Sequence, residues 1–153
     1  MSAIASATPS ATPSAACSLC ENEGGLLVFR NDQLRIIQAD EPGFPAFYRV
    51  VWNHHVAEFS DLSASERDTC MNAVVVVEQT LRTQLQPCKI NLAALGNMVP
   101  HLHWHVIVRF KWDSHFPAPV WSTPQRALDI EKLAQVALDC VNINRLIAEK
   151  MAR

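Results

Sequence analysis

The chain has 153 residues and a mass of 17.0 kDa, which is enough for one domain with a single hydrophobic core. Hydrophobic residues make up 49% and charged residues 18%, the balance of a globular protein and not of a disordered chain. The net charge of −2 argues against a basic groove for nucleic acid.

The sequence also indicates where the protein works. The longest uninterrupted apolar run, Ala73–Val77, is far shorter than the roughly 18 residues that span a bilayer. Residues 1–16 are small, rich in Ser, Thr and Pro, and lack the basic and apolar regions of a secretion signal, which predicts a flexible tail. Five cysteines, an odd number, indicate reduced thiols, some of which can bind a metal. We therefore expect a cytoplasmic protein that contacts no membrane.

A hairpin and a third strand are predicted after the tail. The domain is expected to begin at Cys17, and branched and aromatic residues over 26–30 and 34–38 flank an Asn-Asp turn, which favours two paired strands. After a Pro-rich break, residues 47–52 predict a strand whose side chains alternate between two faces. One face would carry Phe47, Arg49 and Val51, and the other Tyr48, Val50 and Trp52.

A long helix is predicted next. Ser63 and Glu66 have the spacing of a capping box, and apolar residues recur behind them at intervals of three or four up to Leu85. The helix must end near Gln86, because Pro87 cannot continue it.

The remaining elements complete the expected fold. Residues 90–95 and 102–110 predict two strands joined through a Gly-Asn turn. Thr123 can cap a final helix, with Pro124 in its first turn and its end near Glu149. The sequence therefore predicts an α+β fold, with an antiparallel sheet of about five strands, one long central helix and a C-terminal helix.

Three histidines, His101, His103 and His105, alternate along the last predicted strand. Side chains alternate faces along a strand, so the three would stand in a row with neighbours roughly 6 to 7 Å apart. Imidazoles can bind a metal, act as nucleophiles or donate protons to a phosphate. A polar strand face with hydrogen-bonded histidines is the alternative, but three in a row from a total of six favour a chemical role.

The turn before this strand adds possible anion donors. Gly96 would expose backbone N–H groups, and Asn97 adds a side-chain amide, a neutral donor set that can hold a phosphate oxygen. Alone, Gly-Asn indicates only a hairpin turn, and it gains weight because it leads into the histidines.

The segment His101–Val108 resembles the signature of the histidine triad family, in which histidines alternate with apolar residues. The resemblance extends from about Cys17 to Trp121 and implies a histidine triad domain over 17–121, with a C-terminal helix over 122–153 on the same domain. Proteins of this family are α+β domains that pair as homodimers around a continuous sheet. They cleave a phosphorus bond of a nucleoside phosphate through a nucleotidyl-histidine intermediate, so the resemblance implies a nucleotide hydrolase or transferase.

The resemblance also implies roles for single residues. His103 would be the nucleophile, with its other ring nitrogen held by an acceptor such as a backbone carbonyl. His105 would contact the substrate phosphate or assist the leaving group. Asn97 stands where the family usually has a glutamine that contacts the phosphate, so Asn97 and the adjacent Met98 are candidate substrate-binding residues. Phe47 stands near the position of a further histidine in many members, which implies an unusual substrate or rate.

Cys17 and Cys20 form a C-x-x-C pair, which can arise by coincidence in a chain with five cysteines. In some proteins of the superfamily, such a pair binds structural zinc together with a histidine before the helix and the first histidine of the triad. This resemblance implies Cys17, Cys20, His55 and His101 as ligands, with His54 as an alternative to His55. Two thiolates and two imidazoles suit Zn²⁺ and leave no open position, so one structural zinc per chain is expected.

Two further residues are candidates for substrate binding on the same resemblance. Trp121 lies in a Pro- and Trp-containing tail that in many members reaches the partner subunit's pocket, and a surface connection is the alternative. Asp40 lies near the position where members place an acidic or amide residue on the ribose hydroxyls. Cys70 and Cys140 fall within helix patterns and are expected in the core.

These features lead to competing hypotheses about function. The leading one is an enzyme that attacks a phosphoramidate, dinucleoside polyphosphate or similar nucleoside phosphate through His103. The alternative is a zinc-stabilised nucleotide-binding module with little or no turnover, which Phe47 and Asn97 favour. A pure metal-handling protein leaves the Gly-Asn turn without a role. The sequence has no Walker glycine pattern, which disfavours metal-assisted nucleoside triphosphate chemistry.

A homodimer is expected on two grounds. The histidine triad resemblance implies pairing. In addition, the strand over 47–52 or the last strand would otherwise present an unprotected edge, and sheet edges are normally paired or covered.

Overall fold

The computed structural model describes residues 17–153, so the tail predicted over residues 1–16 lies outside the described residues. The chain forms a five-stranded sheet in which all neighbours are antiparallel, in the order β1-β2-β3-β5-β4. The strands are β1 (Leu26–Arg30), β2 (Leu34–Gln38), β3 (Phe47–Trp52), β4 (Lys89–Ala93) and β5 (His103–Arg109). The helices are α1 (Ser18–Glu21), α2 (Ala64–Leu85) and α3 (Ile130–Met151), with a 3₁₀ turn, η1, at Phe59–Asp61. The predicted α+β fold is confirmed.

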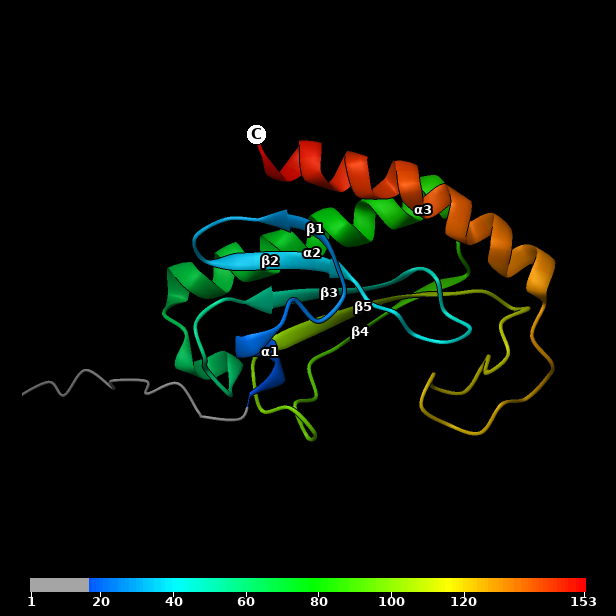
Figure 1. Ribbon diagram of the computed structural model, residues 1–153, viewed down its shortest axis with the longest axis horizontal. Helices are drawn as coiled ribbons and strands as arrows, with labels where there is room; N and C mark the ends of the chain where they lie inside the picture. The colour runs from blue at the N-terminus through cyan, green and yellow to red at the C-terminus, as the bar shows by residue number, and fades with distance from the viewer. Residues whose placement is uncertain (1–16) are drawn as a thin grey trace, which may run out of the picture.

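Helices α2 and α3 cover one face of the sheet, and α1 lies with the opposite face (Figure 1). The main core lies between the sheet and the two long helices and contains Tyr48, Val50 and Trp52 of β3. On the opposite face, Val51 packs with the N-terminal segment, and Phe47 packs in a small separate cluster. The predicted alternation of β3 is therefore confirmed, and the face without long helices is left available for a site.

Helix α2 begins and ends where local signals place it. Both hydrogen bonds of the predicted capping box between Ser63 and Glu66 are present. Gln86 adopts a left-handed conformation with φ 46°, and its N–H bonds to the carbonyl of Arg82, which closes the last turn before Pro87. This helix carries the chain from β3 across the sheet toward β4.

The last helix begins later than predicted. Asp129, and not Thr123, is the N-cap of α3, and its side chain accepts a hydrogen bond from the N–H of Lys132. The backbone N–H groups of Gln125 and Arg126 bond instead to the carbonyl of Ser114, so this stretch is tied to the preceding loop and is not available for a helix. The hydrogen bonds to Ser114 thus outweigh the helix-start signal of Thr123 and Pro124.

The prediction that residues 47–52 could form an edge of the sheet was also wrong. Strand β3 lies in the middle of the sheet, paired with β2 on one side and β5 on the other. The edges are β1 and β4. The reason is the crossover through α2, which brings the last strand to lie between β3 and β4.

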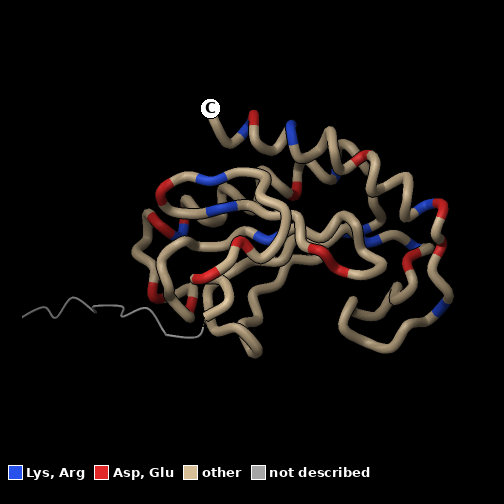
Figure 2. Tube along the Cα trace, in the orientation of Figure 1, with Lys and Arg blue, Asp and Glu red and all other residues tan. Residues whose placement is uncertain are grey.

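Two features of composition can be followed in the structure. Cys70 and Cys140 are buried in the main core, as predicted. Acidic and basic residues are interspersed along the described part of the chain (Figure 2). Within residues 17–153, no helix has both the length and the apolar character of a membrane span.

Candidate active site and metal centre

The first histidine of the row is turned toward the cysteines. His101 lies two residues before the start of β5 and is fully buried. Its Nε2 lies 2.6 Å from the carbonyl oxygen of Trp52, so this nitrogen carries the proton and donates it to the carbonyl. Nδ1 is then the free acceptor, and it lies 3.4 Å from the Sγ atoms of both Cys17 and Cys20. Burial lowers the pKa of His101, which keeps the ring neutral, the form that binds a metal.

Four side chains converge on one small volume. The ligand atoms of Cys17, Cys20, His55 and His101 all lie within 4.8 Å of one another. His55 contributes its Nδ1, at 3.3 Å from the Sγ of Cys20, whereas His54 is exposed and stands outside this group. Two sulfurs and two imidazole nitrogens form a complete donor set for Zn²⁺. The second nitrogen of His101 is held by a carbonyl, as in known metal sites, so the residues fit a zinc ion.

Sequence reasoning missed the residue that holds this loop in place. Arg35 of β2 is buried, and its Nη2 donates to the carbonyls of Leu19 and Asn22 at 2.7 and 3.3 Å. Its Nε donates to the carbonyl of Glu23 at 3.2 Å. One guanidinium thereby satisfies three carbonyls of the segment that carries the cysteines. A lone Arg inside the apolar strand Leu34–Gln38 was the available signal.

The second histidine has the tautomer that a nucleophile requires. His103 is the first residue of β5, and its Nδ1 lies 2.6 Å from the carbonyl oxygen of His101. Because Nδ1 must donate to this oxygen, Nε2 bears the lone pair. Burial lowers the pKa of His103, so the ring is neutral and the lone pair is free at neutral pH.

The third histidine lies beside the second. The rings of His103 and His105 are 4.7 Å apart between centroids and nearly perpendicular. His105 is 5% exposed, and burial lowers its pKa to about 3, with a further contribution from the charges of His103 and Arg49. Its Nδ1 is buried and has no hydrogen-bond partner among residues 17–153. His105 is therefore neutral at pH 7.

Two aromatic residues pack against His105. The ring of Trp121 lies 5.3 Å from that of His105, and Phe47 lies 5.4 Å from His105 on the neighbouring strand. Trp121 is itself 51% exposed, and its ring partly covers His105 of the same chain. Phe47 is fully buried and forms an apolar floor at this position.

The tail that carries Trp121 is anchored by an ion pair that the sequence analysis did not identify. Arg109 of β5 donates from Nε and Nη2 to the two carboxylate oxygens of Asp113, at 2.9 and 3.1 Å. Both side chains are buried, at 2% and 4% exposure. Although burial by itself raises the pKa of Asp113, hydrogen bonds from Arg109 and from backbone N–H groups outweigh it and hold the pKa below the ordinary value. Arg109 also donates to the carbonyl of Ala118, close to Trp121.

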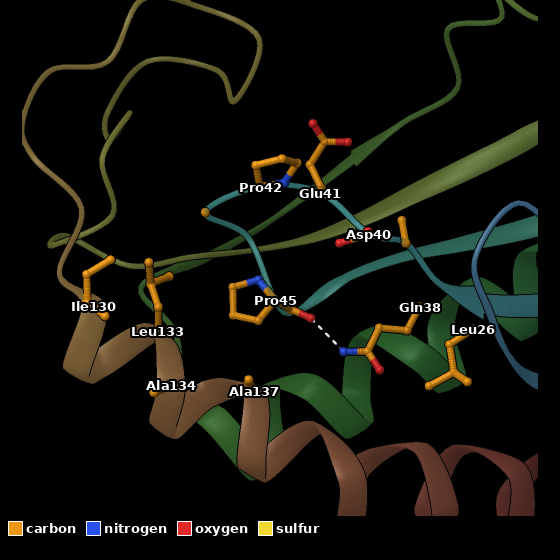
Figure 3. A pocket seen from close by; sticks show the side chains of 12 residues that line it. Leu26, Gln38, Asp40, Glu41, Pro42, Pro45, Ile130, Leu133, Ala134 and Ala137 are labelled. Atoms are coloured by element: carbon orange, nitrogen blue, oxygen red, sulfur yellow. Dashed lines mark hydrogen bonds between the residues drawn. The ribbon is translucent and has the colours of Figure 1, made fainter.

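Three of the predicted substrate-binding residues lie in connections between strands and are exposed. Asn97 and Met98 occupy the exposed connection from β4 to β5, after a Gly96 with φ +71° that makes the predicted turn. Asp40 is exposed and lines an open groove of about 600 Å³ between the β2–β3 connection and α3, which contains no histidine. Figure 3 shows this groove, with Leu133 and Ala137 of α3 facing Pro45.

Comparison with known proteins gives a consistent picture. A family model described as the HIT domain matches residues 22–112, which is more than half of the chain. No curated protein matches the sequence.

Solved structures with the same fold include several histidine triad proteins. One from Bradyrhizobium japonicum is 26% identical, and the match covers 82% of this chain and 92% of that protein at a TM-score of 0.65. A hypothetical histidine triad nucleotide-binding protein from Sulfolobus tokodaii is 16% identical, with 80% and 83% covered and a TM-score of 0.55. A Zn-bound histidine triad family protein from Mycobacterium smegmatis is 14% identical, with 79% and 87% covered and a TM-score of 0.52. The last two likenesses show the fold alone.

Proposed function

This chain belongs to the HIT domain family, and from that premise we propose that it is a nucleotide hydrolase or transferase that forms a nucleotidyl intermediate on His103. Most members of the family are nucleotide hydrolases or transferases. The observation that carries the proposal is the 2.6 Å contact from Nδ1 of His103 to the carbonyl of His101. It commits the proton to Nδ1 and leaves the Nε2 lone pair for attack on phosphorus.

The reaction proceeds in two displacements. Nε2 of His103 attacks the α-phosphorus, the bond from phosphorus to the leaving group breaks, and the leaving group departs with the bonding pair and takes up a proton. Water, or another acceptor in a transferase, then attacks the same phosphorus, loses a proton and releases His103. A neutral, buried His103 suits the first step, because no proton has to leave Nε2 before this nitrogen attacks.

We assign the metal site a structural role. Cys17, Cys20, His55 and His101 would hold one Zn²⁺ per chain, and a related fold from Mycobacterium smegmatis is Zn-bound. The ion would supply four bonds that tie the N-terminal segment to the start of β5. All four positions come from the protein, so no position is open for substrate. His101 then serves as a ligand, and only His103 and His105 remain for catalysis.

The proposal is tested with adenosine and guanosine phosphoramidates, dinucleoside polyphosphates and nucleotide sugars in parallel, with release of nucleoside monophosphate followed in each. We expect turnover of one class by the wild-type protein, and a loss of several orders of magnitude in His103→Ala, because a covalent nucleophile is removed. His103→Ala should still bind the nucleoside monophosphate. If it kept more than about a tenth of the activity, His103 would not be the nucleophile.

A second candidate function is a nucleotide-binding module with little turnover. Phe47 favours it, because this buried ring offers neither a proton nor a hydrogen bond beside His105. The same assay separates the two functions. A binding module would retain nucleoside phosphates with measurable affinity and release no monophosphate from any of the substrate classes.

We also propose that two chains pair through β4. This strand is an edge of the sheet, and Leu92 and Leu95 at and after it are exposed. The other edge, β1, also exposes Leu26 and Leu27, but it contacts α3. Sedimentation at micromolar concentration should therefore show a species of twice 17.0 kDa, and Leu92→Lys should shift it toward the monomer. Leu26→Lys on β1 is the matched control and should leave the dimer intact. A wild-type protein that sediments only as a monomer would refute this pairing.

A further inference from the structure

Arg49 lies directly beside the proposed catalytic histidines. In the antiparallel pair of β3 and β5, Arg49 is the register partner of His105. Residues directly opposite each other in such a pair project from the same face of the sheet. Arg49 is therefore on the histidine face, one strand away from His103 and His105, although the sequence analysis gave it no role beyond its place on that face.

The guanidinium of Arg49 is only partly satisfied. Its Cζ lies 5.4 Å from the centre of the Phe47 ring, and its nearest carboxylate is Glu41, with 3.7 Å between Nη2 and Oε2. At this distance the two side chains form an ion pair but no hydrogen bond. The Nε atom is buried and has no partner within residues 17–153. The Arg49 side chain is 24% exposed, so water can reach the rest of the guanidinium, but the buried Nε–H donor is costly to leave unpaired unless a ligand accepts from it.

A second unpaired group lies on the neighbouring strand. Nδ1 of His105 is buried and has no hydrogen-bond partner in the described chain. Arg49 stands opposite His105 and is charged at any physiological pH, so it supplies positive charge at this place.

We propose that Arg49 binds the phosphate group that His103 attacks. This inference rests on the proposed function and deepens it, because it makes a 5′-phosphate anion on a nucleoside the feature that the site recognises. The planar guanidinium can bind two non-bridging phosphate oxygens at once. Because those oxygens keep their negative charge during displacement, the same contacts stabilise the transition state. The phosphate would replace the Glu41 carboxylate as the partner of this guanidinium.

The test compares ligands that differ only in the phosphate. Affinities for AMP and adenosine, and for GMP and guanosine as a second pair, are measured by calorimetry on the wild-type protein, Arg49→Met, Arg49→Lys and Glu41→Gln. Arg49→Met should weaken monophosphate binding by about 10- to 100-fold, the effect of one or two charge-assisted hydrogen bonds, and leave nucleoside binding unchanged. Arg49→Lys should recover part of the loss, since it keeps the positive charge but lacks the paired N–H donors of the planar guanidinium. Glu41→Gln should bind the monophosphate at least as well as the wild type, because the competing carboxylate is gone.

Two outcomes would overturn the assignment. If monophosphate and nucleoside affinities fall together in Arg49→Met along with the melting temperature, Arg49 is only a structural partner of Glu41. If Arg49→Met binds AMP and GMP as the wild type does, the phosphate is held elsewhere. A wild-type protein that binds neither monophosphate and turns over none of the substrate classes would instead refute the proposed function itself.

Discussion

The three alternating histidines have three different environments. His101 faces the cysteines and is held by the carbonyl of Trp52, His103 is held by the carbonyl of His101, and the Nδ1 of His105 has no partner in the described residues. Since a carbonyl holds one nitrogen of His101 and one of His103, hydrogen bonds and not the spacing decide the tautomers of these two rings. One row of identical side chains can therefore supply a metal ligand, a nucleophile and a neutral neighbour.

The neutral state of His105 predicts a pH dependence of stability. Its pKa is about 3 in the folded protein and about 6.5 in an unfolded chain, so between these values the unfolded chain binds a proton that the folded chain does not. Stability must therefore fall as the pH falls from about 6.5, by up to about 1.4 kcal/mol per pH unit from this residue. Chemical denaturation between pH 7 and 4 should show a shallower decline in His105→Gln than in the wild type. Parallel curves would show that His105 binds its proton over the same pH range in the folded and unfolded protein.

At the scale of elements, two buried arginines organise loops that carry site residues. Arg35 holds the segment with Cys17 and Cys20 through backbone carbonyls, and Arg109 holds the tail with Trp121 through Asp113. A loop has no repeating hydrogen-bond ladder, so a buried guanidinium with several donors is an effective way to fix it. These arginines position the candidate site without touching it.

The Arg109–Asp113 pair gives a prediction about stability. Asp113→Ala should destabilise the protein by about 3 to 5 kcal/mol, because it leaves the Arg109 charge buried without its partner. The backbone N–H groups of Phe110, His115 and Phe116 lose an acceptor as well. Urea unfolding measures the change.

Asp129→Ala is the matched control, because it also removes one carboxylate but from an exposed helix N-cap. This variant should cost only about 1 kcal/mol. Equal losses in the two variants would mean that the buried pair is not the anchor of the tail.

At the scale of the whole molecule, the metal site joins parts of the chain that are far apart in sequence. Cys17 and His101 are 84 residues apart, and their side chains meet at the edge of the histidine face. Because an unfolded chain does not hold this donor set together, metal binding would contribute directly to the free energy of folding. The contribution should be large for a domain of this size.

This linkage predicts the effect of metal removal. Protein purified without added metal should contain one zinc per chain by elemental analysis. Chelation or Cys20→Ser should lower the melting temperature by at least about 5 °C, whereas His103→Ala should not, since only the former removes a ligand. A zinc content well below one per chain, with unchanged melting in chelator, would show that Cys17 and Cys20 are ordinary thiols.

Much of the fold and of the candidate site follows from the sequence alone, because it depends on short-range rules. The capping box at Ser63, the end of α2 before Pro87 and the strand alternation that aligns the histidines each depend on residues within a few positions of one another. The family resemblance carried by the segment His101–Val108 agrees with the family model that matches residues 22–112.

Only the tertiary structure decided the features that depend on contacts between distant segments. It put β3 inside the sheet, delayed α3 until Asp129 and brought Arg49 opposite His105. Strand order and register are set by the chain that crosses the sheet and by the packing of whole elements, and no local pattern encodes either. The sequence thus determined which residues could do chemistry, and the fold determined which of them meet.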